Sequence, residues 1–203
     1  MPKILLIGDI HGKIDAWNSY HHNSKADFSI ALGDIGIGFP ASPSNLNLQS
    51  NQYFIRGNHD NPLECRKLKP NYLGDYTLDQ NNSIFYISGA ASLPWDRINR
   101  IEGRTIWHDE ELTDTNFNEI LNLVLYYRPK IIISHECPLS LHNRLFGYNT
   151  LYPSKTSIFM DKLLDVHQPE AWYFGHHHRS NVLTFQGIHF QCLAELEILT
   201  ITV

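Results

Sequence analysis

Five times along this 203-residue chain, a short apolar run ends in a turn that carries Asp, Asn or His, and we call each such place a junction. Apolar runs without polar alternation are typical of strands buried on both faces, as in parallel sheets. The runs that end in this way are 4–7, 28–32, 53–55, 131–133 and 171–174. Because open α/β sheets bind ligands at the carboxyl ends of their strands, the pattern predicts an α/β fold with one site at that edge.

The polar side chains at these junctions are the candidate site residues. Taken singly, a Gly-Asp pair is more often a turn than a ligand, and a lone His is more often a packed or surface group. Their repetition at five strand ends favours a shared site. Oxygen and imidazole ligands in these numbers suit two divalent cations held side by side, and such a pair supports hydrolysis of a phosphate ester. The candidates are Asp9, His11, Asp34, Asn58, His59, His135, His176 and His178.

Helical periodicity appears in the middle of the chain. Phe117, Ile120 and Val124 recur at helical spacing, Thr113 is the expected N-cap, and Pro129 lies just past the expected end. The segments 36–50, 89–105 and 138–154 are rich in Gly, Pro or Asn and are predicted to be irregular, the first and last as loops near or over the site. The remaining expected elements are helices at 13–22 and up to His167, and strands at 83–88 and between 182 and 202 around a turn at Gln186-Gly187.

The composition bounds the class of protein. A length of 203 residues with 42% hydrophobic and 18% charged residues predicts one compact domain over residues 1–203. The apolar start at 4–8 is too short for a signal peptide, and no run approaches the length of a membrane span, so we expect a cytoplasmic protein without a membrane partner. The formal charge of −5 argues against extended nucleic-acid binding, although a short or single nucleotide remains compatible. The oligomeric state does not follow from these numbers.

The cysteines give a separate expectation. Cys65, Cys137 and Cys192 are an odd set without Cys-x-x-Cys spacing, so the sequence indicates neither a disulfide framework nor a thiolate zinc site. We therefore expect reduced thiols that serve mostly in packing.

The junction motifs together resemble the calcineurin-like metallophosphoesterase superfamily. They occur in order along nearly the whole chain, and as a set they are highly specific. The resemblance implies an α/β fold, a double β-sandwich flanked by helices in four α/β/β/α layers. The motifs are Gly8-Asp9-Ile10-His11-Gly12, Gly33-Asp34, Gly57-Asn58-His59-Asp60, His135 and Gly175-His176-x-His178.

The resemblance also implies a role for each candidate. Asp34 would bridge two metal ions, and His59 would be the acid beside the phosphate rather than a ligand. Asp9, His11 and His178 would hold the first ion, and Asn58, His135 and His176 the second. Four imidazoles with three oxygen donors favour Mn²⁺ foremost, with Fe, Zn²⁺ or Ni²⁺ as further options, over Mg²⁺ and Ca²⁺. Two divalent ions exceed the charge of two carboxylates and a bridging hydroxide, so the site would attract a phosphate ester and supply the attacking hydroxide.

The group that orients His59 has no clear signature. Adjacent Asp60 is one candidate, although it can equally cap a helix that begins near Pro62. In the protein phosphatases of the superfamily, the Gly-Asp motif continues to an acidic residue and a phosphate-binding Arg. Here Ile37 and Gly38 occupy those positions, which argues against that branch.

The irregular segment 89–105 contains Trp95 and the arginines Arg97, Arg100 and Arg104, and its pattern resembles small bacterial and phage members of the superfamily. Guanidinium groups bind phosphate bidentately, so Arg97 and Arg100 are candidate substrate contacts. The alternative is a loop held by ion pairs to Asp96, Glu102 or Asp109, and both interpretations stay open.

Several other polar residues receive weaker predictions. Arg56 is expected to be structural, and His177, which alternates with two proposed ligands, is expected to point away from them. Four residues of the expected loop 138–154 either contact a base or sugar or only cover the edge of the core. These are His142, Arg144, Tyr148 and Tyr152.

Three functions are compatible with these patterns. The leading hypothesis is a binuclear metal-dependent phosphoesterase that hydrolyses a phosphomonoester or a small nucleotide-type phosphodiester by attack of a metal-bridging hydroxide. The alternatives are a nuclease that acts on nucleic-acid ends and a non-catalytic scaffold that retains the fold. Retention of every ligand position argues against the scaffold, and the absence of a basic stripe argues against the nuclease.

Overall fold

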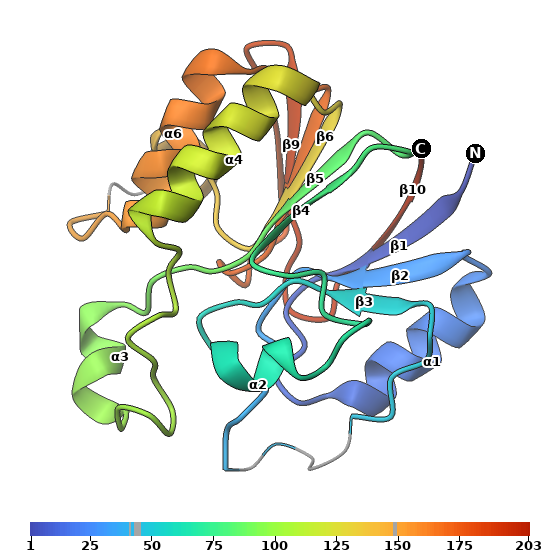
Figure 1. The fold of residues 1–203 in the computed structure, drawn as a ribbon, viewed down its shortest axis with the longest axis vertical. Helices are drawn as coiled ribbons and strands as arrows, with labels where there is room; N and C mark the ends of the chain where they lie inside the picture. Colours follow the sequence, from blue (N-terminus) through green and yellow to red (C-terminus); the bar gives the residue numbers. More distant parts are fainter. Residues whose placement is uncertain (41, 43–45, 148–149) are drawn as a thin grey trace.

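The structure is a computed structural model that describes residues 1–40, 42, 46–147 and 150–203. Within these ranges the strands form a four-stranded sheet and a six-stranded sheet (Figure 1). The four-stranded sheet has the order β10 (Ile198–Thr202), β1 (Lys3–Ile7), β2 (Phe28–Ala31), β3 (Gln52–Phe54). The six-stranded sheet has the order β4 (Tyr76–Asp79), β5 (Ile84–Ile87), β6 (Ile131–Ser134), β7 (Ala171–Phe174), β9 (Ile188–Cys192), β8 (Asn181–Phe185).

Both sheets are mixed, and the strands that directly precede the site residues pair in parallel. Strands β1, β2 and β3 pair in parallel, and so do β5, β6, β7 and β9, whereas β10, β4 and β8 are antiparallel to their neighbours. The carboxyl ends of β1, β2 and β3 therefore share one edge of the first sheet, and those of β6 and β7 share one edge of the second.

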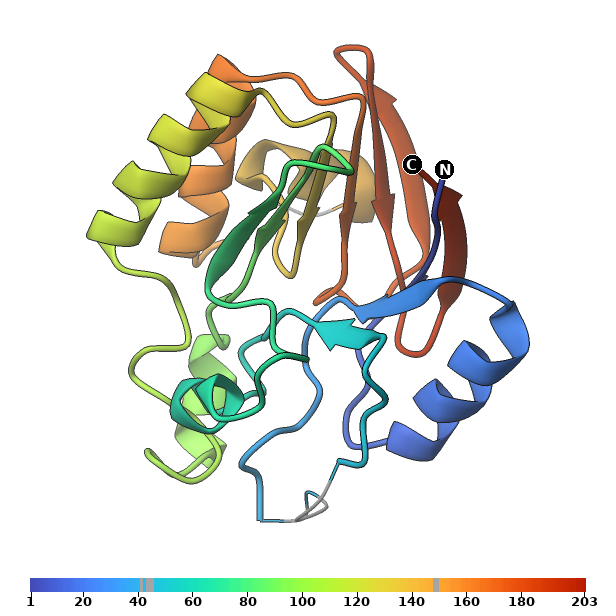
Figure 2. The same cartoon turned by 45° about the vertical axis from the view of Figure 1, so that its right-hand side comes forward.

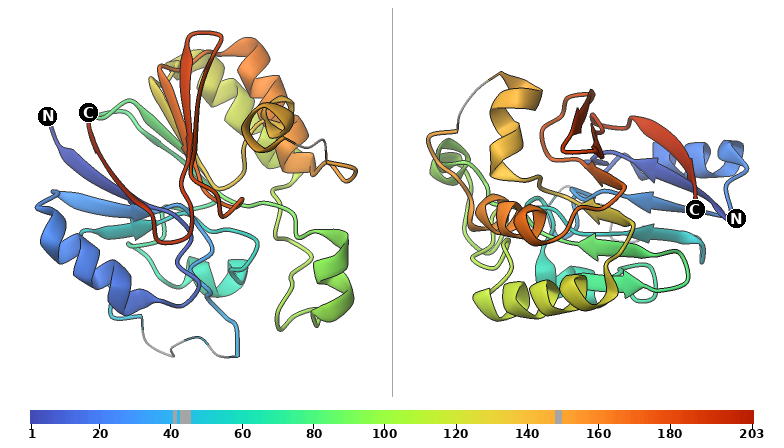
Figure 3. Two further views of the ribbon diagram at one scale, coloured as in Figure 1. Left: turned by 180° about the vertical axis from the view of Figure 1, so that it is seen from behind. Right: turned by 90° about the horizontal axis from the view of Figure 1, so that it is seen from above.

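Three apolar layers hold the sheets and helices together. Along β1, Ile4 and Leu6 point between the two sheets, whereas Leu5 and Ile7 point toward α1 (Ile14–Ser24), which carries buried Trp17. This alternation follows from the two-residue period of a strand. The other face of the six-stranded sheet packs against α4 (Asp114–Tyr127) and α6 (Lys155–Val166). The helices therefore cover the outer faces of the two sheets, as the predicted four layers require (Figures 1 and 3).

Helix ends agree with the local sequence signals. Thr113 caps α4 in a capping box with Asn116, as its position before the apolar repeat predicts, and Ser154 caps α6.

The two chain termini lie close together because β1 and β10 pair antiparallel (Figure 2). Among the described residues, no helix has both the length and the apolar character needed to cross a bilayer.

Two predicted irregular segments contain helices. Pro94 begins the helix α3 (Pro94–Asn99) rather than breaking a pattern, because proline suits the first helical position. The segment 138–154 contains the 3₁₀ turn η1 (Leu139–Leu141) and the helix α5 (His142–Phe146), which ends at Gly147 in the left-handed conformation. Residues 41, 43–45, 148 and 149 of the predicted loops lie outside the described residues.

Of two further elements, the strand β4 had no prediction of its own, whereas a helix was expected to begin near Pro62. Strand β4 is half-buried along its length and has only Leu78 as an aliphatic residue, so it lacks a strand-like alternation. The short helix α2 (Pro62–Arg66) is capped by the side chain of Asn61.

Candidate metal centre

The predicted site residues from separate strand ends come together in two groups that share one member. In each group, one donor atom of every residue lies within 4.8 Å of the others. The first group is Asp9, His11, Asp34 and His178, and the second is Asp34, His135 and His176. Asp34 therefore stands between the two groups, at the end of β2.

The first group directs imidazole nitrogens and carboxylate oxygens toward one point. His178 Nε2 lies 3.0 Å from Asp9 Oδ2 and 3.0 Å from His11 Nε2. His11 Nε2 lies 3.8 Å from Asp34 Oδ2. Asp9 Oδ2 is buried and accepts no hydrogen bond from the described residues. A buried carboxylate oxygen without a hydrogen bond is costly, and a cation at this point would remove that cost.

The second group is organised by the tautomer of His135. Its Nδ1 lies 2.7 Å from the carbonyl oxygen of Leu32 and donates to it, so in the neutral imidazole the lone pair is on Nε2. Nε2 in turn lies 3.3 Å from Asp34 Oδ1 and 3.3 Å from Asn58 Oδ1. A lone pair that faces two oxygen atoms needs a proton or a cation between them. Metal-binding histidines commonly have this backbone contact on the other ring nitrogen.

The electrostatics of His135 and Asp34 show how strongly they interact. Burial disfavours the charged imidazole, but the charge of Asp34 and its hydrogen bond raise the pKa of His135 to about 10. Burial likewise opposes ionisation of Asp34, yet His135, His59 and His11 hold its pKa well below its usual range. The Asp34 carboxylate is therefore ionised at neutral pH, as a metal ligand must be.

The backbone at the site is held in an unusual conformation. His11 (φ 45°), Asp34 (φ 49°), His176 (φ 67°) and His178 (φ 51°) all lie in the left-handed region. This region costs a non-glycine residue roughly 1–2 kcal/mol, and such strain is found mostly where the surrounding structure enforces it at functional sites. The Asp34 carbonyl accepts hydrogen bonds from the amides of Ile10 and His11, which fixes the β1 turn against the β2 turn.

Two glycines make room for His135 and Asp34. A Cβ on Gly57 would lie 2.1 Å from Asp34 Oδ1 and 2.5 Å from His135 Nε2. A Cβ on Gly33, whose φ is +112°, would lie 2.3 Å from His135 Nδ1. These contacts explain why both motifs place glycine directly before the polar residue.

Asp60 has neither of the two roles considered from sequence. It is buried and accepts hydrogen bonds from the amides of Ile35, Gly36, Ile37 and Gly57 at 2.8–3.1 Å. Burial and the nearby charge of Asp34 raise the pKa of Asp60 to about 6, against the effect of these amides. Asp60 thus joins the turns after β2 and β3, and neither orients His59 nor caps α2.

His59 lies beside both groups of potential ligands but belongs to neither. Its Nε2 is 2.7 Å from Arg100 Nη2, which donates to it, and its ring stacks on Phe39 with centroids 5.6 Å apart. Its backbone amide donates to Asp34 Oδ1 at 2.8 Å. Burial lowers the pKa of His59, and Arg100 adds to that effect while Asp34 opposes it. Arg100 and Phe39 therefore orient this imidazole, a contact that sequence reasoning missed because no spacing rule joins these segments.

A cavity of about 770 Å³ opens in front of the two groups. Asp34, Asn58 and His176 line its floor, and α3 with the segment 150–155 forms much of its wall. The predicted ion pairs of the segment 89–105 with carboxylates are present. Arg100 Nη2 lies 3.7 Å from Oδ2 of Asp96, which was one of the predicted partners. Arg97 pairs with Glu110, which was not among them.

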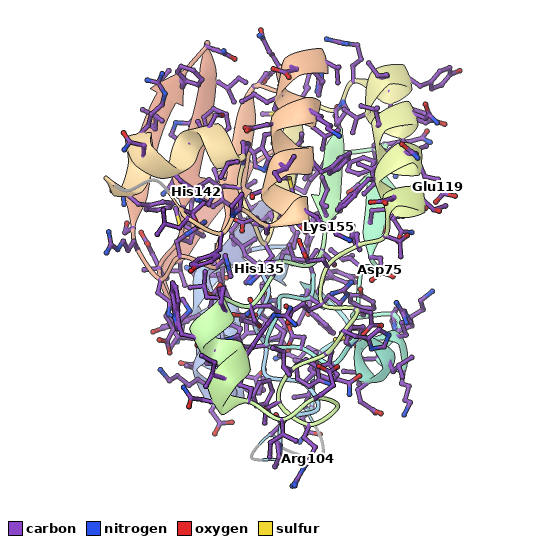
Figure 4. The ribbon with its side chains drawn as sticks, turned by 90° about the vertical axis from the view of Figure 1, so that its left-hand side faces the viewer. Asp75, Arg104, Glu119, His135, His142 and Lys155 are labelled. Carbon is purple, nitrogen blue, oxygen red and sulfur yellow. The ribbon has the colours of Figure 1, made fainter. Side chains whose placement is uncertain are left out.

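The other weaker predictions have mixed outcomes. His142 and Tyr152 line the cavity, whereas Arg144 lies over the ring of Phe185 and Tyr148 is outside the described residues. Arg104 is exposed and lies at the lower edge of Figure 4, away from the labelled His135. Arg56 is buried and donates to Asp75 and to the Glu110 carbonyl, as expected of a structural residue.

His177 and Glu136 form a contact that the sequence did not indicate. His177 Nε2 lies 3.0 Å from Glu136 Oε1, and Glu136 Oε2 lies 3.7 Å from His176 Nε2. Glu136 is buried, and despite that burial the nearby histidines hold its pKa well below its usual range. In the sequence, the signal for a role of Glu136 was its position directly after His135 at the end of a strand.

Comparison with known proteins shows the family to which the chain belongs. The model of the calcineurin-like phosphoesterase family matches residues 2–180, and the chain belongs to that family. Metal-dependent hydrolysis of phosphate esters and the use of divalent metal ions are the general properties of that family. No curated protein matches the chain in sequence.

Two solved structures match this chain over most of its length. GAP50, the anchor in the inner membrane complex of Plasmodium, has a TM-score of 0.53 and 10% identity over 96% of this chain and 72% of that one. A conserved uncharacterized protein from Streptococcus pneumoniae TIGR4, described as a predicted phosphoesterase, has a TM-score of 0.41 and 12% identity over 99% of this chain and 83% of that one. At 10% identity the likeness to GAP50 concerns the fold alone.

Proposed function

We propose that this protein is a binuclear metal-dependent phosphoesterase. In this proposal Asp9, His11 and His178 bind one ion, Asn58, His135 and His176 bind the other, and Asp34 binds both. The observation that carries it is the position of Asp34, with Oδ2 3.8 Å from His11 Nε2 and Oδ1 3.3 Å from His135 Nε2. The mixture of imidazole and oxygen donors favours Mn²⁺, with Fe, Zn²⁺ or Ni²⁺ as alternatives.

The donor set is suited to such ions. Asp9 Oδ2 is buried without a hydrogen bond from the described residues, and His135 Nε2 faces two oxygens. When bound, two divalent ions supply an activated water nucleophile and neutralise charge on the phosphoryl oxygens. The chain's own residues then have to bind the ester and provide a proton to the leaving group.

His59 and Arg100 are suited to these two tasks. We assign His59 the protonation of the leaving oxygen, because its imidazole lines the cavity beside both metal groups and Arg100 holds the ring there. Arg100 lines the cavity and holds His59 Nε2, so its guanidinium can bind a phosphate oxygen beside the acid. Arg97, which pairs with Glu110, is assigned mainly to holding the cavity wall.

The cavity supports a small organic phosphate as substrate. A volume of about 770 Å³ exceeds what a phosphate group alone requires and falls within the usual range of small-molecule pockets. Exposed Trp95 and Tyr152 on its wall offer aromatic surface to a substituent. We infer a phosphomonoester or a nucleotide-type phosphodiester, and the net charge of −5 argues against a long nucleic acid.

The test is hydrolysis by the purified chain with added Mn²⁺. Comparison of p-nitrophenyl phosphate with bis-p-nitrophenyl phosphate separates a monoesterase from a diesterase, and prior removal of metal with a chelator should abolish either activity. Absence of turnover with every metal in a protein that binds about two ions per chain would contradict the catalytic assignment.

A scaffold function is the second candidate, because the similar structure GAP50 is described as an anchor. That likeness is one of fold, so the same hydrolysis assay decides between the two. We further propose that residues 1–203 act as one domain, since β10 near the end of the chain pairs along β1. A cytoplasmic location stays a prediction from the sequence.

A further inference from the structure

A third group of potential ligands lies next to the two groups that form the proposed binuclear centre. It consists of Glu136, Cys137, His142 and His177, and one donor atom of each lies within 4.8 Å of the others. Glu136 and Cys137 follow β6, His142 is the first residue of α5, and His177 follows β7. We propose that this group is a separate tetrahedral binding site for a Zn²⁺-type cation.

Two of the three donor separations in this group match a tetrahedral zinc site, and the third is shorter. Zinc bonds of about 2.0–2.3 Å imply donor-to-donor distances of about 3.3–3.7 Å. Cys137 Sγ lies 3.4 Å from His177 Nε2. Glu136 Oε1 lies 3.0 Å from His177 Nε2 and 3.7 Å from His142 Nε2. A small adjustment of these side chains would centre an ion among them.

The donor types select the class of cation. A thiolate and two imidazoles favour Zn²⁺ or Co²⁺ over Mg²⁺ and Ca²⁺. The Cys137 thiolate and the Glu136 carboxylate would balance the charge of a divalent ion, so the occupied site would be neutral within a buried environment. None of these residues belongs to the two groups that contain Asp34.

Hydrogen bonding by Glu136 alone explains only part of the arrangement. Glu136 Oε1 accepts from the Cys137 amide at 2.8 Å and contacts His177 Nε2. Glu136 Oε1 also lies 3.7 Å from His142 Nε2, so the Glu136 carboxylate accounts for the positions of both imidazoles. It does not account for the approach of the Cys137 thiol, whose Sγ lies 3.4 Å from His177 Nε2, and a common cation explains why all four donors meet at one place.

The site also has an entry path and a structural consequence. Glu136, His142 and His177 line the cavity of about 770 Å³, so a cation can reach them from solvent. Four protein ligands are typical of structural zinc sites, and this set would fasten α5 to the ends of β6 and β7.

The test uses the full-length chain loaded with Co²⁺. A cobalt–thiolate bond gives a near-ultraviolet charge-transfer absorption, and the proposed binuclear centre contains no thiolate. We expect the absorption in the wild type and in Asp34→Asn, and its loss in Cys137→Ser. Cys65→Ser and Cys192→Ser are matched controls, since both thiols are also buried, and they should retain it. Zinc content should fall by about one ion per chain in Cys137→Ser.

The outcomes separate this site from the binuclear centre. A cobalt-loaded wild type without the absorption would overturn the proposal even if Cys137→Ser does not fold. An absorption that survives Cys137→Ser and disappears in Cys192→Ser would overturn it as well. If Asp34→Asn loses hydrolysis and metal but keeps the absorption, the further site holds independently of the catalytic assignment. Loss of the absorption in His142→Gln or its shift in that variant supports the imidazole ligand.

Discussion

Arg100 Nη2 lies 2.7 Å from Nε2 of His59, so the proposed acid is oriented by a cation and not by a carboxylate. The same guanidinium lies 3.7 Å from Asp96 Oδ2 and lines the cavity. Arg100 therefore connects the proposed proton donor with the space that a phosphate ester would occupy.

Substitution of Arg100 should weaken both phosphate binding and catalysis. We expect Arg100→Gln to raise KM and to weaken inhibition by inorganic phosphate, with a loss of about 1.5–3 kcal/mol in transition-state binding from a charged hydrogen bond. Arg104→Gln is the matched control because Arg104 is exposed and lies outside the cavity lining. Equal kinetics of the two variants would exclude Arg100 as a substrate contact.

Removal of the His59 imidazole should reduce rate without loss of metal. We expect His59→Ala to retain its ions and to lose about 10²- to 10⁴-fold in kcat with an alkyl phosphate, and less with p-nitrophenyl phosphate, whose leaving group needs little protonation. Steady-state kinetics with both esters and elemental analysis measure this. Loss of metal in the variant would instead identify His59 as a ligand.

The shared position of Asp34 predicts unequal effects on metal content. Asp34→Ala should abolish turnover and leave less bound metal than His178→Ala, because Asp34 belongs to both ligand groups and His178 to one. Elemental analysis after identical reconstitution compares the two variants. The same metal content in both would contradict the bridging role.

Gly57→Ala should disrupt the proposed metal centre, although Gly57 is not itself a ligand. Its Cβ would lie 2.1 Å from Asp34 Oδ1, so either the carboxylate or the turn has to move. We expect a loss of metal affinity and of activity. Gly187→Ala is the control, since that glycine has a positive φ but a Cβ there would meet no atom within 4 Å. Normal metal binding by Gly57→Ala would mean that the turn is more adaptable than the structure indicates.

The burial of Arg56 predicts a large effect on stability that is separate from catalysis. Its guanidinium donates to Asp75 at 2.9 Å, and Arg66 contacts the same carboxylate from a more exposed position at 3.0 Å. We expect Arg56→Ala to lower the free energy of unfolding by about 3–5 kcal/mol, and Arg66→Ala by less than about 1 kcal/mol. Urea unfolding curves at neutral pH measure both, and similar losses would refute the distinction.

The pairing of Asp75 also sets a pH dependence. Although burial opposes it, Arg56 holds the pKa of Asp75 below its ordinary value, so the unfolded chain binds the proton more readily than the folded one. This contribution is present above the unfolded pKa and is lost as the pH falls through the folded pKa, below about 3.9. Arg56→Ala should remove that acid-sensitive part of the stability.

The strands that supply the candidate ligands were the most predictable part of the fold. Their apolar runs are continuous because both faces are buried, and each ends directly before a polar turn, so residues such as Asp9 and His135 could be placed at strand ends from the sequence alone. The family match supports the predicted layers, and the termination of α4 and α6 also agreed with the sequence signals.

The elements and side-chain contacts that could not be predicted from the sequence are those that depend on tertiary contacts. Strand β4 is defined by its pairing with β5, and α5 by packing around buried Leu145 and Phe146, so neither has a strong local pattern. The position of Asp60 depends on amides from the turn after β2, and that of Glu136 on histidines from α5 and β7. Such contacts join segments that are far apart in sequence, and residue spacing does not reveal them.

The two sheets contribute different members of the proposed ligand set. Asp9, His11, Asp34 and Asn58 follow strands of the four-stranded sheet, whereas His135, His176 and His178 follow strands of the six-stranded sheet. Cations bound there would cross-link the two halves of the sandwich, and ligands that bind only the native state raise its resistance to unfolding. Metal supply would then govern how long the folded molecule survives as well as whether it can turn over an ester.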